Sequence, residues 1–400
     1  MESLFQKQER LLAQTQTDIV RDMMNSIHWD RRLIAVRGSR GVGKTTLIKQ
    51  FIKLNYPAGS REVLYCSLDS MYFSNHSLLE LAENFYLMGG KRLFLDEVHK
   101  YSTWSKEIKE IYDMYPSLQI VFTGSSLLNL INADADLSRR CLPYYMPGLS
   151  FREFLKFYKD MDFPAYGLEE LLRNANKICL DVTDKCRPQP LFEEYLQCGY
   201  YPFFDGNKED YHISIENVVN YIIEQELPSL CGTDPAYSRK IKALLAIIAT
   251  SVPFKIDIMK LAKTIGLARN SVIAYLQNLD KAELIKLLYS DLLSVKKMQK
   301  PDKIYVQNTN LLNAIVSGNV HVGTIRETFV VNQLCSSGHE VEYGRSAGDF
   351  VVDGKYTFEV GGPDKTFRQI AGIDNSYILA DRIELVSGNK LPLWLIGMIY

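Results

Sequence analysis

A glycine-rich stretch near the N-terminus constrains this 400-residue chain more than any other feature. Residues 38–45 read GSRGVGKT and fit the pattern G-x-x-x-x-G-K-[ST] at every fixed position. Before it, residues 32–37 contain a short apolar run that indicates a buried strand; after it, residues 46–54 have apolar side chains at helical spacing. Such a turn aims backbone N–H groups and the positive end of a helix dipole at an anion. The sequence therefore predicts a phosphate-binding loop.

The residue types within this loop assign individual roles. We expect Lys44 to contact the β- and γ-phosphates of a nucleotide and the Thr45 hydroxyl to bind Mg²⁺. ATP with Mg²⁺ is the expected ligand, although the pattern itself does not distinguish ATP from GTP. The predicted nucleotide-binding residues are Gly38, Ser39, Arg40, Gly41, Val42, Gly43, Lys44, Thr45 and Thr46.

A pair of acids follows an apolar run at residues 91–98, KRLFLDEV, which predicts a strand. Ligands of open α/β sheets bind at the carboxyl ends of the strands, so we expect Asp96 and Glu97 to lie beside the loop. Asp96 is predicted to hold the Mg²⁺ shell, and Glu97 to act as the general base that activates water. An acid in the position of the base is typical of ATPases.

Two further sets of polar residues are candidates for contacts with the γ-phosphate. Residues 118–126, LQIVFTGSS, predict a strand, and Thr123 and Ser125 near its end are sensor candidates; the alternative is that such hydroxyls cap the next helix. Arg139 and Arg140 precede a fifth predicted strand. Either is a candidate arginine finger, within the same molecule or on a neighbouring subunit, and a solvated arginine is the alternative.

The order of these elements predicts a parallel sheet covered by helices on both faces, an α/β fold. Residues 62–69 complete the predicted strands, and residues 78–87 and 104–115 predict helices between them. Residues 1–31 are expected to be helical, with Trp29 in the core rather than against an adenine. At the other end of the chain, residues 391–400 are apolar and predict a buried terminal strand.

Composition excludes several classes of protein. There are 46 basic and 47 acidic residues, so a polyanion-binding surface along the whole chain is not indicated, although a local patch is compatible with these numbers. The seven cysteines include no C-x-x-C pair, which indicates reduced thiols rather than a disulfide framework or a zinc site. No apolar run is long enough to span a bilayer and no signal peptide is seen. We expect a cytoplasmic protein without a membrane partner.

The middle of the chain predicts a helix-turn-helix with a wing. Residues 151–245 are mostly helical in pattern; residues 258–265 and 269–280 predict two helices, followed by strands at 284–289 and 303–306. Binding of DNA would use Arg269, Asn270 and Ser271 in the major groove and Lys296, Lys297, Lys300 and Lys303 on phosphates. Because the second helix carries a single arginine, we favour an internal hinge or docking module and keep DNA binding as the alternative.

The last ninety residues contain three spaced acids. Glu327 lies on a predicted helix, Asp349 begins a strand, and Glu359 lies on the next one. In metal-dependent nucleases such acids hold Mg²⁺, and a lysine two residues after the last acid orients the attacking water. That position is Gly361 here. We therefore expect a degenerate nuclease fold without cleavage, the alternative being that Lys365 reaches in from the following loop.

Several blocks together resemble one family of prokaryotic AAA-type P-loop ATPases. They are residues 38–45, LFLDE at 93–97, VFTGSS at 121–126, PGLSFREFL at 147–155, LQCGYYPFF at 196–204, KIYVQNTNLLNAI at 303–315 and ETFVVNQL at 327–334. In that family the ATPase domain is followed by helices, a winged helix and a domain similar to PD-(D/E)xK nucleases. The resemblance implies ATP binding and hydrolysis in a cellular role that is largely undefined.

These observations predict four domains and two functions. The ranges are an AAA-type ATPase domain at 1–150, a helical lid or linker at 151–245, a winged helix at 246–310 and a degenerate restriction-nuclease-like α/β domain at 311–400. The expected function is that of a Mg²⁺-dependent ATPase acting as a molecular switch; the alternative is a nucleotide-gated DNA-binding protein. AAA-type relatives often assemble, so a homo-oligomer or a protein partner is also considered.

Overall fold

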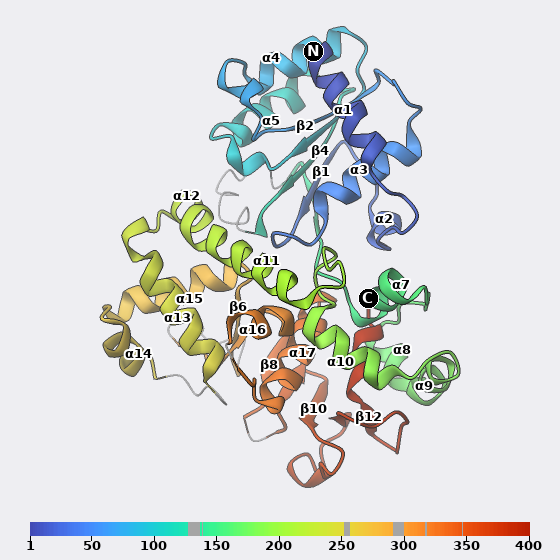
Figure 1. Cartoon of the computed structure of the whole chain (residues 1–400), viewed down its shortest axis with the longest axis vertical. Coiled ribbons are helices and arrows are strands. Elements are labelled where there is room, and N and C mark those ends of the chain that lie inside the picture. The colour runs from blue at the N-terminus through green and yellow to red at the C-terminus, as the bar shows by residue number, and fades with distance from the viewer. Residues whose placement is uncertain (127–136, 138, 252–256, 291–299, 317, 346) are drawn as a thin grey trace. The chain divides into compact units, whose positions relative to one another are not determined.

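The computed structural model describes residues 1–126, 137, 139–251, 257–290, 300–316, 318–345 and 347–400 (Figure 1). The chain divides into two compact units, Met1–Gly148 and Leu149–Tyr400. The four domain ranges given above remain predictions. Within the described ranges, no helix is both long enough and apolar enough to cross a membrane.

The first unit is built on a parallel sheet of five strands in the order β2-β3-β4-β1-β5. This confirms the predicted α/β fold with a parallel sheet. β1 lies between β4 and β5, so the phosphate-binding loop leaves the sheet from an interior strand. The strands are β1 (Leu33–Arg37), β2 (Val63–Ser67), β3 (Arg92–Asp96), β4 (Gln119–Gly124) and β5 (Leu142–Tyr145).

Helices cover both faces of this sheet, because its strands are apolar on both sides. Figure 1 shows α4 and α5 on one side of the strands and α3 on the other. On the α3 side, the Phe51 ring lies 5.8 Å from Phe94 of β3 and stacks at 3.8 Å on Trp29, which is half-buried rather than part of the core. The helices are α1 (Glu2–Gln14), α2 (Met23–Ser26), α3 (Lys44–Asn55), η1 (Met71–Ser74), α4 (Leu78–Leu87), η2 (Val98–Lys100) and α5 (Trp104–Met114).

The two edge strands of the sheet, β2 and β5, are interrupted in different ways. Along β2, the Gln8 side chain of α1 accepts a hydrogen bond from the Tyr65 N–H at 2.6 Å and donates one to the Val63 carbonyl at 3.4 Å. It therefore satisfies backbone groups that an edge strand leaves unpaired. The opposite edge is β5, which contains Pro143 opposite Ala35 of β1. Proline has no backbone N–H to donate.

The second unit begins with a well-capped helix. The Ser150 side chain accepts a hydrogen bond from the Glu153 N–H, and the Glu153 carboxylate accepts one from the Ser150 N–H, which is a capping box. The first helices of this unit are α7 (Phe151–Lys159), α8 (Leu168–Arg173), α9 (Ala175–Thr183), α10 (Pro188–Cys198), α11 (Lys208–Tyr221), the π-helical turn η4 (Ile222–Glu226), α12 (Leu227–Cys231), η5 (Pro235–Tyr237) and α13 (Ser238–Thr250).

The elements expected for a winged helix form close to their predicted positions. Gly266 ends α14 in the left-handed region, with φ of 67°, and so permits the turn into the next helix. The two strands that follow pair antiparallel. The elements are α14 (Ile258–Ile265), α15 (Arg269–Lys281), β6 (Ile285–Leu288) and β7 (Lys303–Val306). Their assignment to the winged-helix class stays a prediction.

The C-terminal part of the second unit contains a mixed sheet in the order β12-β11-β10-β9-β8. β8, β9 and β10 pair antiparallel, while β10, β11 and β12 pair parallel. Buried side chains of α17, among them Phe329 and Val330, share one apolar cluster with this sheet. The elements are α16 (Thr309–Ile315), α17 (Val322–Ser336), β8 (Val341–Tyr343), β9 (Phe350–Val352), β10 (Tyr356–Gly361), η7 (Phe367–Gln369), β11 (Ser376–Ala380), β12 (Lys390–Pro392) and η8 (Leu393–Met398).

The prediction of a terminal strand over residues 391–400 is wrong. β12 ends at Pro392, and the 3₁₀ helix η8 follows it. Every residue of η8 is buried, and a 3₁₀ turn points consecutive residues in three directions rather than two. The packing is close: a Cβ on Gly397 would lie 2.4 Å from the Phe151 Cβ. An apolar run without alternation was compatible with either structure.

Candidate functional site

The loop between β1 and α3 has a backbone that glycine favours. Gly41 and Gly43 have φ of 88° and 101°, in the left-handed region. A Cβ on Gly38 would lie 2.1 Å from the Met146 carbonyl oxygen, so that position has no room for another residue. Gly43 is the N-cap of α3, and among the described residues no side chain caps the helix there. The first turn of α3 therefore presents its N–H groups as an anion site does.

Arg21 fixes the position of this loop. Its guanidinium donates hydrogen bonds to the Val42 carbonyl at 3.3 Å, to the Pro147 carbonyl at 3.1 Å and to the Gly148 carbonyl at 3.0 Å. The loop is thereby joined to the segment that follows β5. Val42 is buried, whereas Thr46, in the first turn of α3, is exposed.

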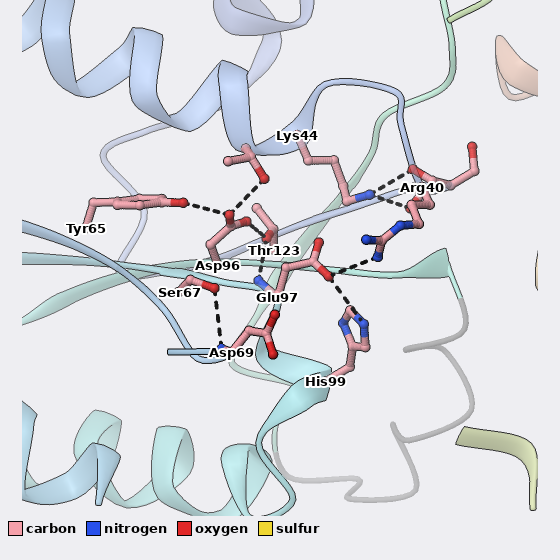
Figure 2. A network of polar contacts seen from close by, with 12 residues as sticks. Arg40, Lys44, Tyr65, Ser67, Asp69, Asp96, Glu97, His99 and Thr123 are labelled. Atoms are coloured by element: carbon pink, nitrogen blue, oxygen red, sulfur yellow. Dashed lines mark hydrogen bonds and ion pairs between the residues drawn. The ribbon is translucent and has the colours of Figure 1, made fainter. Parts of the chain in front are cut away.

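Lys44 is buried and its amine bends back over the loop (Figure 2). Nζ donates to the Gly38 and Ser39 carbonyls, both at 2.8 Å. The Ser39 hydroxyl is buried and has no hydrogen-bond partner in the part of the chain that the structure describes. A positive amine, a lone hydroxyl and an uncapped helix N-terminus thus meet in one loop, which fits a polyphosphate.

Asp96 lies at the end of β3 and accepts hydrogen bonds from three hydroxyl groups (Figure 2). Thr45 Oγ1 and Tyr65 Oη each donate to Oδ2 at 2.8 Å, and Thr123 Oγ1 donates to Oδ1. Burial, and then the charge of Asp96, raise the pKa of Tyr65 well above its ordinary value. A hydroxyl and a carboxylate side by side are oxygen ligands of the kind that Mg²⁺ prefers.

Glu97 adopts an unusual backbone conformation beside Asp96. Its φ is 55°, in the left-handed region that non-glycine residues seldom occupy, and its N–H donates to Thr123 Oγ1 at 3.0 Å. Oε2 lies 3.4 Å from His99 Nε2 and 3.9 Å from Arg40 Nη1. Burial raises the pKa of Glu97, and the positive charge of Lys44 opposes that rise. Two side chains thus contact the carboxylate, and a third, that of Thr123, holds the backbone N–H of the same residue.

The structure brings together most of the predicted residues of this site. Hydrogen bonds connect Thr45, Asp96, Thr123 and Glu97 at the carboxyl edge of the sheet (Figure 2). Lys44 precedes Thr45 in the chain, and its amine is bonded to the loop carbonyls. The sensor candidate Ser125 is buried just beyond β4. All assigned roles remain predictions, but the juxtaposition on which they depend is present.

The two candidate arginine fingers lie elsewhere. Arg139 and Arg140 precede β5, which runs parallel to β1, so they are at the amino edge of the sheet and the loop is at the carboxyl edge. Arg140 Nη2 is 3.2 Å from Asp113 Oδ1. This placement argues against an arginine finger that acts on the loop of the same molecule. An arginine finger that acts on a neighbouring subunit stays a prediction.

Sequence reasoning missed three contacts of this site. Tyr65 was assigned no role, and Arg40 was expected to contact nucleotide rather than Glu97. His99 was not singled out, although its place two residues after Glu97, in the η2 turn, is a usable signal. A tyrosine inside an otherwise apolar strand is a weaker signal. Its buried hydroxyl needs a hydrogen-bond partner, but the sequence does not show which residue that partner is.

A second group of acids lies in the C-terminal part of the second unit. Glu327 of α17 accepts hydrogen bonds from Lys303 Nζ at 3.1 Å and from Tyr305 Oη at 2.5 Å. Lys303 is buried in this contact, so its predicted role on a DNA phosphate is wrong. Burial and the charge of Glu327 raise the pKa of Asp349 to about 6.

Glu359 of β10 pairs with Lys365, whereas the nuclease pattern has its lysine at position 361. The Lys365 amine forms an ion pair with Glu359 Oε1, and the Lys365 side chain lies over Gly361. The structure therefore places the Lys365 amine close to position 361, where the nuclease pattern has its lysine. The sequence analysis had favoured a site without this amine. Across the described residues, no group of three or more histidine, cysteine, aspartate or glutamate side chains is arranged to hold a metal ion.

The residues considered for DNA binding are partly accessible. Arg269 and Asn270, at the start of α15, are exposed and Ser271 is half-buried, while Lys300 is exposed. Lys296 and Lys297 lie outside the described residues.

Two family models match parts of the chain. Residues 30–155 match the model of an AAA domain, and residues 189–320 match a domain of unknown function, DUF8612. The AAA match includes the loop, Asp96, Glu97 and Thr123. The chain therefore carries an AAA-type P-loop domain, which suggests ATP binding and hydrolysis.

Two curated relatives come from Methanocaldococcus jannaschii. Uncharacterized protein MJ1637 is 27% identical over 368 residues, covering 85% of this chain and 77% of the relative. Uncharacterized protein MJ1544 is 24% identical over 323 residues, covering 77% and 67%. The chain is thus a distant homologue of archaeal proteins of unknown role.

Two solved structures give weak likenesses. A structure described as the structural basis for katanin self-assembly aligns with a TM-score of 0.28 and 12% identity, covering 68% of this chain and 84% of its own. A structure of C. elegans PCH-2 aligns with a TM-score of 0.23 and 13% identity, covering 69% and 68%. At these TM-scores the likenesses carry no argument.

Proposed function

We propose that this protein, with its AAA-type domain at residues 30–155, binds ATP together with Mg²⁺ and hydrolyses it, and that hydrolysis drives a molecular switch. One observation carries the proposal. Thr45 Oγ1, at the start of α3, lies 2.8 Å from Asp96 Oδ2, and Glu97 follows directly in the chain. A helix N-terminus, a metal-binding pair and a base are thereby collected at one edge of the sheet.

The chain's own residues fit the two ligands. The Thr45 hydroxyl and the Asp96 carboxylate would hold Mg²⁺, which supplies positive charge to the β- and γ-phosphates when it is bound. The lone Ser39 hydroxyl and the uncapped N-terminus of α3 offer donors to phosphate oxygens. Lys44 would exchange its two carbonyl partners for phosphate oxygens.

The proposed hydrolytic step uses Glu97 as the base. Its carboxylate takes a proton from a water molecule while the water oxygen bonds to the γ-phosphorus. The bond from that phosphorus to the β–γ bridging oxygen breaks, and ADP and phosphate leave. Lys44 and the loop N–H groups stabilise the charge on the phosphoryl oxygens. Arg40 and His99, which contact Glu97 Oε2, are proposed to hold the base in position.

The test is steady-state ATP turnover by the full-length protein, with and without Mg²⁺. Lys44→Ala should lower turnover by at least about 100-fold and weaken nucleotide binding, because the phosphates lose their cation. Glu97→Gln should lower turnover by about 100-fold or more while nucleotide still binds, because only proton transfer is lost. Binding is measured separately with a fluorescent ATP analogue.

Matched control variants separate these effects on turnover from a general loss of folded protein. Lys106→Ala and Glu110→Gln change exposed residues of α5 and should leave turnover unchanged. Full turnover by Glu97→Gln would show that another group is the base. Full turnover by Lys44→Ala would remove the loop from the reaction altogether.

DNA binding gated by nucleotide is the second candidate function. The exposed Arg269 and Asn270 at the start of α15 support it, and the buried Lys303 weakens it. Binding to duplex DNA that falls steeply with salt, and that Arg269→Ala reduces, would favour this function. The absence of binding at low salt would exclude it.

A further inference from the structure

Arg40 is part of the phosphate-binding loop, where it directly precedes Gly41, and its side chain is turned toward the proposed base. Nη1 of Arg40 is 3.9 Å from Glu97 Oε2, and Figure 2 shows this guanidinium facing the Glu97 carboxylate. A base that activates water is one water molecule away from the phosphorus that the water attacks. A guanidinium beside Glu97 therefore lies close to the region proposed for the γ-phosphate, and it is a second cation there besides Lys44.

The position of Arg40 differs from that of the two predicted arginine fingers. Arg139 and Arg140 precede β5 and lie at the amino edge of the sheet, whereas Arg40 follows β1 and lies at the carboxyl edge with Asp96 and Glu97. An arginine that stabilises charge on a transferred phosphoryl group can come from the same molecule. Arg40 meets this requirement from within the loop.

The contact between Arg40 and Glu97 is weak enough to be exchanged. The Arg40 side chain is 38% exposed, and the separation of 3.9 Å is longer than a hydrogen bond. Ion pairs between such accessible groups contribute little free energy. A γ-phosphate presents more negative charge and more oxygens to the planar guanidinium, and its charge-assisted hydrogen bonds are among the stronger ones. Bound ATP is therefore a better partner for Arg40 than Glu97 is.

Other contacts hold Glu97 when Arg40 leaves it. The Glu97 N–H donates to Thr123 Oγ1 at 3.0 Å, and Oε2 lies 3.4 Å from Nε2 of His99, whose side chain is 1% exposed. Burial raises the pKa of Glu97, while the charges of Lys44 and Arg40 oppose that rise. The departure of Arg40 therefore makes the carboxylate a stronger proton acceptor, as a general base requires.

We propose that Arg40 is a catalytic residue of the ATPase reaction and that it exchanges Glu97 Oε2 for oxygens of the γ-phosphate when ATP binds, an inference that rests on the proposed function. ADP has no γ-phosphate, so Arg40 stays at Glu97 when ADP is bound. One movement of Arg40 thus adds positive charge at the phosphoryl group and frees the base.

Nucleotide affinities of the full-length protein test the contact with the γ-phosphate. Isothermal titration calorimetry with Mg²⁺ compares ADP with AMPPNP, an ATP analogue that resists hydrolysis. Arg40→Ala should weaken AMPPNP binding by at least about 10-fold, because a charge-assisted contact is lost, and should change ADP binding by less than about 2-fold. Arg40→Lys keeps the charge but not the planar fork, so its AMPPNP affinity should be intermediate. Arg31→Ala, at an exposed position of the same unit, should change neither affinity.

A double-mutant cycle tests the exchange itself. Glu97→Gln removes the carboxylate that competes for Arg40, so the gain in AMPPNP affinity should be at least about 3-fold larger with Arg40 present than in the Arg40→Ala background. ADP binding should show no such coupling, because ADP does not displace Arg40. A general loss of folded protein would affect both nucleotides alike. In steady-state turnover, Arg40→Ala should lower kcat by at least about 100-fold.

The outcomes distinguish a wrong role for Arg40 from a wrong function. If ATP turnover depends on Lys44 but Arg40→Ala weakens AMPPNP and ADP binding equally, or weakens neither, the role of Arg40 is wrong and the ATPase stands. Absence of coupling between Arg40 and Glu97 in AMPPNP binding overturns the exchange in the same way. If the wild type binds neither nucleotide, the role of Arg40 and the proposed function fail together.

Discussion

At the scale of single residues, the Thr123 hydroxyl connects the two acids of the candidate ATP site. It donates to Asp96 Oδ1 and accepts from the Glu97 N–H at 3.0 Å. A hydroxyl that bonds to both acids fixes the left-handed backbone of Glu97 relative to the carboxylate of Asp96. Thr123 therefore positions both groups from one neighbouring strand, β4.

We expect Thr123→Val to lower ATP turnover by about 10- to 100-fold with little change in nucleotide affinity. Valine keeps the shape of the side chain but leaves the Glu97 N–H without an acceptor, so the base loses its fixed orientation. Turnover and binding of a fluorescent ATP analogue are measured in parallel. Thr123→Ser, which keeps the hydroxyl, is the control, and equal losses in both variants would contradict the role given to the hydrogen bonds.

Residues within short motifs were predictable, and contacts across distant segments were not. Lys44, Thr45, Asp96 and Glu97 follow from the loop pattern and from an acid pair at a strand end, because the chemistry requires those types at that spacing. The Lys365–Glu359 pair is different. It depends on the path of a loop and on the lack of a Cβ at Gly361, and neither is encoded in a spacing rule.

At the scale of elements, α1 completes the edge of the parallel sheet through Gln8. We expect Gln8→Ala to lower the free energy of unfolding by about 1–3 kcal/mol, because the Tyr65 N–H and the Val63 carbonyl lose their side-chain partner. Urea denaturation measures the change. Gln6→Ala, at an exposed position of the same helix, should change stability by less than about 0.5 kcal/mol. Equal effects of both variants would mean that helix propensity, and not edge pairing, is responsible.

Element types followed from the sequence where periodicity and caps agreed. The helix predicted over residues 78–87 is α4 with the same bounds, and its start is marked by a Ser77 cap. The prediction for the final apolar run was wrong because that run has no periodicity. Residues 393–398 have no polar member to set a period, so only packing against the rest of the unit decides between a strand and a 3₁₀ helix.

At the scale of the whole molecule, buried thiols make stability depend on alkaline pH. Burial raises the pKa of Cys66 in the first unit and of Cys179 in the second unit to about 12. The unfolded chain releases these protons near the ordinary thiol pKa of about 8.5 to 9. Between these values the folded state binds more protons, so the free energy of unfolding falls as pH rises.

The expected loss at pH 10.5 is about 2 kcal/mol for each of the two thiols. Urea denaturation under reducing conditions at pH 8 and at pH 10.5 measures the total loss, to which the thiols of Cys141 and Cys198 and the buried tyrosines add with the same sign. Cys66→Ala combined with Cys179→Ala should make the loss smaller by about 4 kcal/mol. Stability between pH 6 and pH 7 serves as the internal control, since both thiols stay protonated there. An unchanged loss in the double variant would contradict the assignment.

The two edges of the parallel sheet have a consequence for self-association. A bare edge strand is a template on which a second chain can add its own strand and begin an aggregate. Gln8 occupies backbone groups of β2, and Pro143 removes a donor from β5. Within the described residues, neither edge strand has an unbroken row of free backbone hydrogen-bonding groups. Each of these features interrupts the row of backbone groups on which a strand of a second copy would have to add.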